Sequence, residues 1–119
     1  MKSFTDLKVW QKGMELMAAA YELSKKFPRS ECYGLTQQLH DSTRSVVSNI
    51  AEGFGRFTFP DKANRYTIAR GECAESESHI LMAITLKYVT AEEASRCLGM
   101  AREVGRMLSG LISACRSRS

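Results

Sequence analysis

The stretch that decides the fold runs from Thr90 to Cys115 and reads TAEEASRCLGMAREVGRMLSGLISAC. It opens with Thr90 followed three residues later by Glu93, the pattern of a capping box at the start of a helix. Small or apolar residues then recur at intervals of four and three, the spacing of a helix face that packs along a neighbour. They are Ala94, Leu98, Ala101, Gly105, Leu108, Ile112 and Cys115. The pattern predicts a helix over residues 91–116, which a neighbouring helix can approach closely at the alanines and the glycine.

Three other segments also show helical spacing. Residues 5–27 carry a wide apolar face and end before Pro28, since the residue before a proline is pushed out of the helical region. Residues 34–55 and 59–89 have similar apolar faces and are separated by a few residues. Short connections between helices of this length are typical of antiparallel neighbours. The sequence therefore predicts one all-α domain over residues 1–119, an up-down-up-down four-helix bundle.

Composition narrows the class of protein further. Among the 119 residues, 44% are apolar and 25% charged, which is ordinary for a globular domain. We expect a cytoplasmic protein without membrane segments, because no apolar run approaches the length of about 20 residues that a span needs and the N-terminus lacks a signal-peptide pattern. The cysteines are far apart, so we interpret them as small buried hydrophobes or free thiols rather than a zinc site or disulfides. They are Cys32, Cys73, Cys97 and Cys115.

The sequence shows no pattern of enzyme chemistry. Neither His40 nor His79 has a glutamate three residues before it, as a di-iron site in a bundle requires. The turn of a serine hydrolase and the glycine-rich loops that bind phosphate are also missing. A nucleophile pair of Cys73 with His40 has no supporting signature, and a buried thiol is the simpler interpretation. We expect no catalytic residues, no metal and no cofactor.

The segment from Asn49 to Arg56 departs from ordinary helix composition. Gly53 and Gly55 each cost a helix roughly 1 kcal/mol relative to alanine, and we attribute both to a helix that ends before Thr58. Polar residues form a stripe beside the apolar face of residues 34–55, which favours a hydrogen-bonded junction between helices or subunits over a ligand groove. The predicted junction residues are Ser45, Asn49, Glu52, Gly53 and Arg56.

Positive charge is concentrated near the C-terminus. The net charge is +4, and the segment after Ala94 carries five arginines against the single acid Glu103. Such an excess suggests an acidic partner such as nucleic acid, although cations also stabilise a helix C-terminus without any ligand. The candidate nucleic-acid-binding residues are Arg96, Arg102, Arg106, Arg116 and Arg118.

Motifs spread over most of the chain also carry a family resemblance. They are Phe4-x-x-Leu7-x-Val9-Trp10-Gln11-Lys12, Phe27-Pro28-x-x-Glu31-x-Tyr33-Gly34-Leu35-x-x-Gln38-Leu39, Ser45 with Asn49-Ile50-Ala51-Glu52-Gly53-x-x-Arg56, Ala69-x-Gly71 with Glu75, and Glu103-x-x-Arg106-Met107-Leu108. Together they resemble the four-helix-bundle proteins encoded in bacterial 23S rRNA intervening sequences, which are similar to the accessory proteins of diversity-generating retroelements.

The resemblance implies a homopentamer with a basic surface proposed to bind RNA or DNA, and in the retroelement relatives an association with a reverse transcriptase. The chain departs from the family pattern at His40-Asp41, where a basic pair is common, and at Gly71-Glu72, where Gly-Ser is common. Both changes favour the arginines of residues 91–116 as the binding residues. The hypothesis is a non-enzymatic oligomer that binds nucleic acid, and the alternative is a protein scaffold without nucleic-acid affinity.

Overall fold

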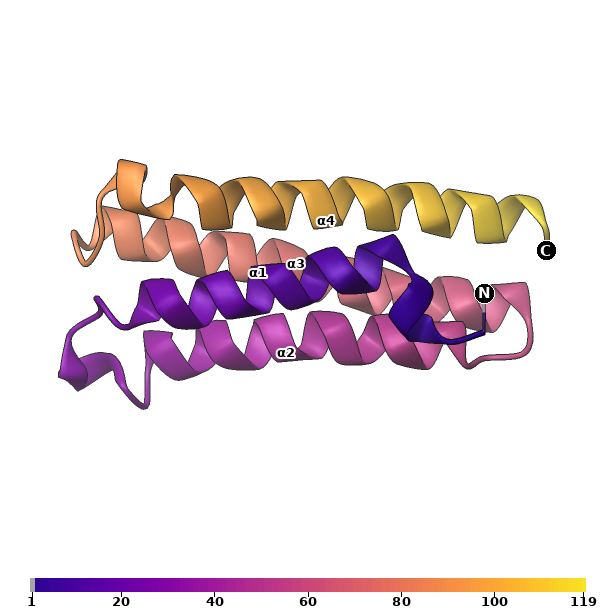
Figure 1. The fold of residues 1–119 in the computed structure, drawn as a ribbon, viewed down its shortest axis with the longest axis horizontal. Coiled ribbons are helices and arrows are strands. Elements are labelled where there is room, and N and C mark those ends of the chain that lie inside the picture. Colours follow the sequence, from indigo (N-terminus) through magenta and orange to yellow (C-terminus); the bar gives the residue numbers. More distant parts are fainter. Residues whose placement is uncertain (1) are drawn as a thin grey trace.

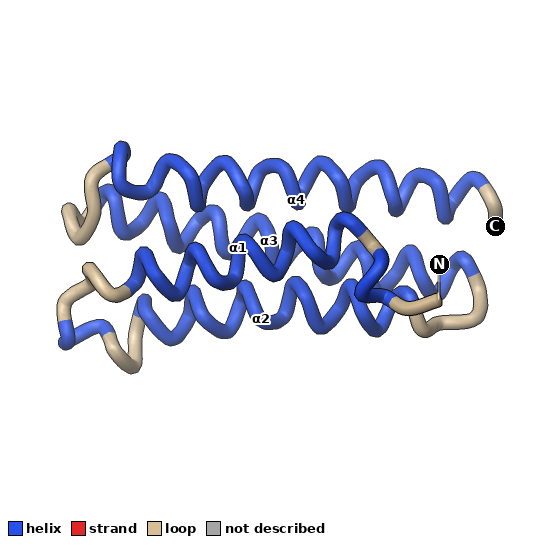
Figure 2. The backbone as a smooth tube through the Cα atoms, in the orientation of Figure 1, coloured by secondary structure: helices blue, strands red, loops and turns tan. Residues whose placement is uncertain are grey.

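The computed structural model describes residues 2–119, which form a rod of 45 × 22 × 20 Å. The four long helices are α1 (Lys8–Ser24), α2 (Leu35–Phe54), α3 (Phe59–Thr85) and α4 (Ala91–Ser117), with the short 3-10 helices η1 (Phe4–Asp6) and η2 (Arg29–Glu31) before α1 and α2. Consecutive helices run in opposite directions (Figure 1), and the described chain contains no strand (Figure 2). The predicted up-down-up-down bundle is confirmed.

The observed helices differ from the predicted ranges mainly at three ends. The first helix starts at Lys8 because Leu7 is extended, and residues 4–6 form η1, which Ser3 and Asp6 close with a capping box. It also ends at Ser24 rather than residue 27. The third helix ends at Thr85 rather than residue 89. The second and fourth agree with their predicted ranges to within one residue at each end.

The fourth helix begins as its sequence predicts but buries a wider face. The backbone nitrogen of Glu93 donates to Thr90 Oγ1 (3.0 Å), and the backbone nitrogen of Thr90 donates to Glu93 Oε1 (2.9 Å). The buried stripe passes through Cys97 and Val104, whereas the predicted Leu98 and Gly105 are only half-buried. The heptad pattern assigned one residue per turn to the core, but α4 packs against both α1 and α3 and needs more.

Each helix contributes a fully buried aliphatic side chain to one shared core. Leu16, Leu39, Ile80 and Leu108 all have no exposed area. Between α2 and α3 the core is locally polar, because Ser42 Oγ and Ser76 Oγ lie 2.7 Å apart in a buried hydrogen bond. No helix between residues 2 and 119 has both the length and the apolar character needed to cross a membrane.

Lys87 ends α3 in a conformation that favours glycine. Its φ is 64°, and the backbone nitrogens of Lys87 and Tyr88 donate to the carbonyl oxygens of Ile84 and Ala83, both at 2.9 Å. This is the Schellman arrangement, in which an L-residue costs about 1–2 kcal/mol. We expect Lys87→Gly to raise the free energy of unfolding by about 0.5–1 kcal/mol, measured by urea denaturation. A Lys87→Gly protein no more stable than Lys87→Ala would contradict this.

Candidate nucleic-acid interface

The five candidate arginines of α4 do not form one patch, because they lie on two flanks of the helix and just past its end. At about 100° per residue, Arg116 falls within about 40° of Arg102 on the side that faces α3. Arg96 falls about 120° from Arg102, on the side that faces α1. Arg118, just past the end of α4, lies instead over Phe59 at the start of α3. The structure therefore separates residues that the sequence treated as one group.

Arg102 and Arg106 line a groove of about 860 Å³ between α3 and α4. A third arginine, Arg70 of α3, lines it as well. The groove is open because its walls include residues with little or no side chain. An added Cβ at Gly71 or Gly105 would meet nothing within 4 Å. The arrangement presents guanidinium groups from two helices along one shallow channel.

The groove holds more positive than negative charge. Arg102 Nε donates to Glu77 Oε2 at 3.1 Å, so one arginine is neutralised. Arg70 Nη1 donates to the hydroxyl of Ser109 at 3.4 Å, a neutral partner. Within residues 2–119, neither Arg70 nor Arg106 has a carboxylate oxygen within 4.0 Å. Two guanidinium groups at the groove are therefore available to an anion.

The remaining α4 arginines have other surroundings. Arg96 lies beside Glu22, Lys26 and Glu93 where α1 meets α4, and Lys26 Nζ pairs with Glu93 at 3.1 Å. Arg118 lies over the ring of Phe59, with 5.6 Å from the guanidinium carbon to the ring centroid. Charges of both signs surround Arg96, so it is the weakest of the five candidates.

Arg70 is the residue that the sequence interpretation missed. It lies in the middle of α3, where Glu72, Glu75 and Glu77 give the following turns a negative charge. The signal that could have identified Arg70 was the antiparallel register between α3 and α4. Once Glu77 is opposite Arg102, a residue two turns earlier on α3 must face a residue two turns later on α4, as Arg70 faces Ser109.

Comparison with known proteins identifies the family. The family model described as 23S rRNA-intervening sequence protein matches residues 5–110. The chain belongs to this family. A crystal structure of a protein of unknown function from the S23 ribosomal protein family of Bacteroides thetaiotaomicron has the same fold, with a TM-score of 0.78, 22% identity, and coverage of 87% of this chain and 97% of that one. No curated protein gives a significant match.

In this member of the 23S rRNA-intervening sequence family, the Asn49–Arg56 segment lies against α3. An added Cβ on Gly53 would come within 2.6 Å of Tyr66 Cε1, so the glycine makes room for a ring. Glu52 pairs with Arg56 (2.9 Å), just past the end of α2, and with Arg65 (3.4 Å) of α3. The explanation of Gly53 by the end of the helix is wrong, because Gly53 is a buried residue inside α2.

The other predicted junction residues make more local contacts. Asn49 Nδ2 donates to the backbone oxygen (2.9 Å) and the hydroxyl oxygen (3.1 Å) of Ser45, one turn earlier in α2. Gly55, the C-cap of α2, has ordinary space around it and a φ of −76°. Among the predicted junction residues, the contacts with α3 therefore come from Glu52 and Gly53.

Cys73 and His40 lie in different parts of the bundle. Cys73 is buried and its Sγ donates to the carbonyl oxygen of Ala101 (3.0 Å); burial raises the pKa of the thiol to about 11. His40 Nε2 lies 2.8 Å from Ser24 Oγ, and the ring stacks on Tyr21 at 3.7 Å. Ser24 Oγ also lies 2.9 Å from the carbonyl oxygen of Tyr21, so the hydroxyl and the imidazole form a local network between α1 and α2, away from Cys73.

The thiols otherwise follow the sequence interpretation with one exception. Cys73, Cys97 and Cys115 are buried and free, but Cys32 is exposed because it lies in the connection between α1 and α2. Burial raises the pKa of Cys97 to about 11. Among residues 2–119, no three His, Cys, Asp or Glu side chains are grouped closely enough to hold a metal ion.

Both histidines make the stability of the bundle sensitive to acid. Burial is the main cause that lowers the pKa of His79, whose ring nitrogens have no hydrogen-bond partner in the described chain; Glu75, 3.7 Å away, partly opposes it. Burial also lowers the pKa of His40 below its usual 6.5, with Asp41 opposing and Arg44 reinforcing the effect. A histidine whose pKa is lower in the folded state binds more protons when unfolded.

We therefore expect the free energy of unfolding to be constant above the unfolded pKa of 6.5 and to fall as the pH falls below it. Urea denaturation at about pH 7, 6 and 5, followed by circular dichroism, measures this dependence. The free energy of unfolding of the His79→Leu protein should fall less over the same pH range, because this variant lacks one of the two histidines. Equal slopes in the two proteins would show that His79 contributes nothing to the acid sensitivity.

Proposed function

We propose that the protein is a non-enzymatic, cytoplasmic homo-oligomer that binds RNA or DNA through basic grooves repeated around a ring of subunits. The single observation that supports it most strongly is the α3–α4 groove, where Arg70, Arg102 and Arg106 face one channel with Glu77 as the counter-charge. Family membership is consistent with an rRNA context.

The chemistry of the groove suits phosphate. Arginine presents a planar fork of N–H donors that matches two phosphate oxygens. Gly71 and Gly105 leave open space along the channel, so a polynucleotide backbone can approach the helices there. The groove contains no aromatic side chain to read bases, and we expect contacts with phosphate rather than sequence recognition.

Oligomerisation would multiply this modest patch. Four large apolar side chains, Ile68, Leu81, Met82 and Leu86, are exposed on α3 and at its C-terminal end. Such side chains on one helix are suited to a contact with another subunit. The family resemblance implies a pentamer, and a ring of five would carry five grooves. Phosphate affinity grows steeply with the number of contacts.

The test is salt-dependent binding by a protein of known mass. Fluorescence anisotropy with labelled RNA and DNA at about 50 mM and about 200 mM salt should show affinity that falls at least tenfold, as expected for several phosphate contacts. Light scattering should give a mass several times that of the 13.3 kDa subunit. No binding to either nucleic acid at low salt would refute the proposal. A monomeric mass would refute the proposed ring of subunits.

The alternative is a protein scaffold, which the exposed apolar side chains of α3 favour. It predicts a stable complex with another protein and no salt-dependent nucleic-acid affinity. The likeness to retroelement accessory proteins would make a reverse transcriptase the partner to test by co-purification. Leu81→Ser plus Met82→Ser would weaken that complex while leaving the arginine groove intact.

A further inference from the structure

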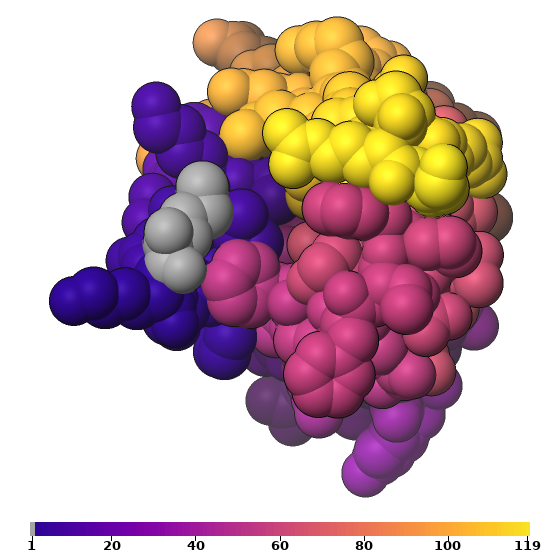
Figure 3. Space-filling view, turned by 90° about the vertical axis from the view of Figure 1, so that its right-hand side faces the viewer, coloured from indigo at the N-terminus to yellow at the C-terminus, as the bar shows by residue number. Residues whose placement is uncertain are grey.

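The net positive charge of the chain is confined to one end of the bundle. Figure 1 shows the two termini and the α2–α3 connection at that end, and Figure 3 looks directly onto it. Residues 2–8, 52–66 and 111–119 contain seven basic and three acidic residues, whereas the rest of the chain has ten of each. The basic residues are Lys2, Lys8, Arg56, Lys62, Arg65, Arg116 and Arg118, and the acidic ones are Asp6, Glu52 and Asp61. We call these three segments the basic end.

Two of the three acidic groups at the basic end, Glu52 and Asp6, are already engaged, and the third, Asp61, offsets only one of the basic residues. Glu52 is shared between Arg56 (2.9 Å) and Arg65 (3.4 Å). Asp6 accepts backbone hydrogen bonds from Lys2 and Ser3. Lys62 donates to the carbonyl oxygen of Phe54 (2.6 Å), which satisfies a free acceptor at the end of α2 without neutralising the charge. An anion that reaches this surface therefore meets unbalanced cations.

Phe57 projects from the tip of the same surface. It lies in the α2–α3 connection with a relative exposure of 101%, so it contacts none of the described chain. A hydrophobic residue directly before a helix cap often packs on the fourth helical residue, as a staple. Here that residue is Lys62, which points to Phe54 instead. The fold thus gives the ring no packing role.

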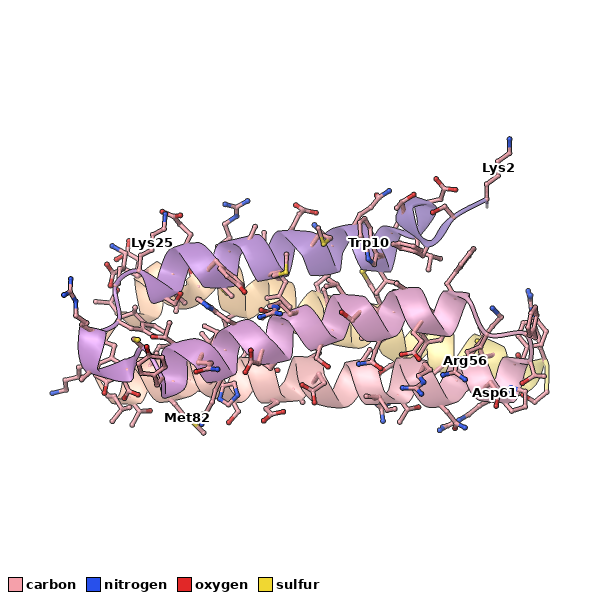
Figure 4. The ribbon with its side chains drawn as sticks, turned by 90° about the horizontal axis from the view of Figure 1, so that it is seen from below. Lys2, Trp10, Lys25, Arg56, Asp61 and Met82 are labelled. Carbon is pink, nitrogen blue, oxygen red and sulfur yellow. The ribbon has the colours of Figure 1, made fainter. Side chains whose placement is uncertain are left out.

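The charged groups at the tip flank this ring. Arg56 precedes Phe57 in the chain and is half-buried, and Figure 4 shows Arg56, Asp61 and Lys2 at the same end of the rod. The opposite end offers a natural comparison, because Tyr33 in the α1–α2 connection is 90% exposed but lies where acidic and basic residues are balanced. Only one end combines an unpacked aromatic ring with excess positive charge.

We propose that the basic end binds single-stranded nucleic acid, with Phe57 stacking on an unpaired base and Arg56, Arg65, Arg116 and Arg118 contacting the phosphates on either side. This deepens the nucleic-acid function proposed above and rests on it. Every base has a face on which an aromatic ring can stack, so the contact needs no particular sequence. In a duplex the bases are already stacked and the ring has no partner.

The surface fits a nucleic acid better than a lipid bilayer. Membrane association grows with the apolar area inserted, usually along the whole face of an amphipathic helix. Among residues 2–119, Phe57 is the one apolar side chain at this tip that is fully exposed, because Phe54 and Phe59 on either side are half-buried against the core. One ring provides little insertion, but it is sufficient to stack on one base.

The experiment compares single and double strands on the full chain. Labelled single-stranded RNA and DNA of about 12 nucleotides, and the matching duplexes, are titrated with the wild type, Phe57→Ala, Phe57→Trp and Tyr33→Ala. We expect Phe57→Ala to lose about tenfold in affinity for the single strands and little for the duplexes. Phe57→Trp should keep the affinity, and Tyr33→Ala, the matched control at the neutral end, should bind as the wild type does.

Two further measurements exclude other occupants of the surface. Phe57→Ala should keep the melting temperature and the light-scattering mass of the wild type, because the ring packs on nothing within the chain. A lower mass would mean that Phe57 contacts a second subunit and would overturn the proposal. So would binding to phosphatidylserine vesicles that depends on Phe57 while single-strand affinity does not.

The outcomes also separate this inference from the function on which it rests. If the wild type binds nucleic acid and Phe57→Ala binds single strands equally well, the stacking surface is refuted and the nucleic-acid function stands. If the wild type binds neither single strands nor duplexes at low salt, both are refuted. If single-strand binding depends on Phe57 but not on the α3–α4 groove, the basic end is supported and the groove is not.

Discussion

Reversing the charge of Arg102 and Arg106 together is expected to reduce nucleic-acid affinity by at least about 50-fold at 0.1 M salt. Each phosphate contact changes the slope of log affinity against log salt by about 0.9, which corresponds to roughly eightfold per contact at this concentration. Charge reversal removes the contact of Arg106, leaves Glu77 without its partner Arg102 and adds two carboxylates, so the groove loses positive charge equivalent to at least two contacts. The slope of the salt titration should also become shallower by about two for each bound subunit.

The matched control changes the same charge elsewhere. Arg29→Glu plus Arg96→Glu has the same net charge, but Arg29 lies in η2 and Arg96 on the α1 flank of α4. We expect this protein to keep affinity to within a few-fold. Arg70→Glu alone should also lower the nucleic-acid affinity, but by less than the change of Arg102 and Arg106 together. Equal losses in the pair and its control would indicate a general effect of net charge and count against a binding groove.

Replacing Gly53 with alanine is expected to lower the free energy of unfolding by about 1–2 kcal/mol, although alanine favours helix. The new Cβ would lie 2.6 Å from Cε1 and 2.8 Å from Cδ1 of Tyr66, and this ring is only 2% exposed and has little room to move. Overpacking of a core costs about 1–3 kcal/mol. The helix propensity of alanine offsets at most about 1 kcal/mol of this.

Gly55, two residues later, provides the control. Its added Cβ would meet only the carbonyl oxygens of Glu52 and Ala51, at 3.5 and 3.8 Å, and its φ of −76° suits any residue. Gly55→Ala should therefore be neutral or up to about 1 kcal/mol more stable. Urea denaturation measures both. In a double-mutant cycle, Tyr66→Leu should remove much of the cost of Gly53→Ala, and simple additivity would show that the ring is not its cause.

The fold followed from local signals that act within a few residues. Helical spacing, Pro28 and the Thr90–Glu93 capping box identified four helices and their order, because each signal is a property of neighbouring residues. The end of α3 was missed for the same reason. Lys87 adopts a left-handed conformation that its own side chain does not favour, so no local sequence signal indicated that the helix ends there.

The candidate site was predictable only in part, because it depends on which helices face each other. Arg102 and Arg106 were found from the charge of one segment, but Arg70 joins them across an antiparallel register that the spacing alone does not fix. The same limit applies to Gly53. Its role depends on Tyr66, which approaches from a different helix. Charge excess was also assigned to α4 alone, although residues 52–66 add three basic residues to the basic end.

Both ends of the chain lie at the end of the rod that carries Phe57, and this has a practical consequence for handling the protein. An affinity tag fused to either terminus begins beside the surface whose binding is to be measured, and a polyhistidine tag would itself contact nucleic acid there. The connection that holds Tyr33 is at the far end of the rod, where its exposed side chain shows that the loop tolerates open space. A circular permutant opened in that connection, with residues 2 and 119 joined by a flexible linker, would carry tags and surface attachments at the far end of the 45 Å rod.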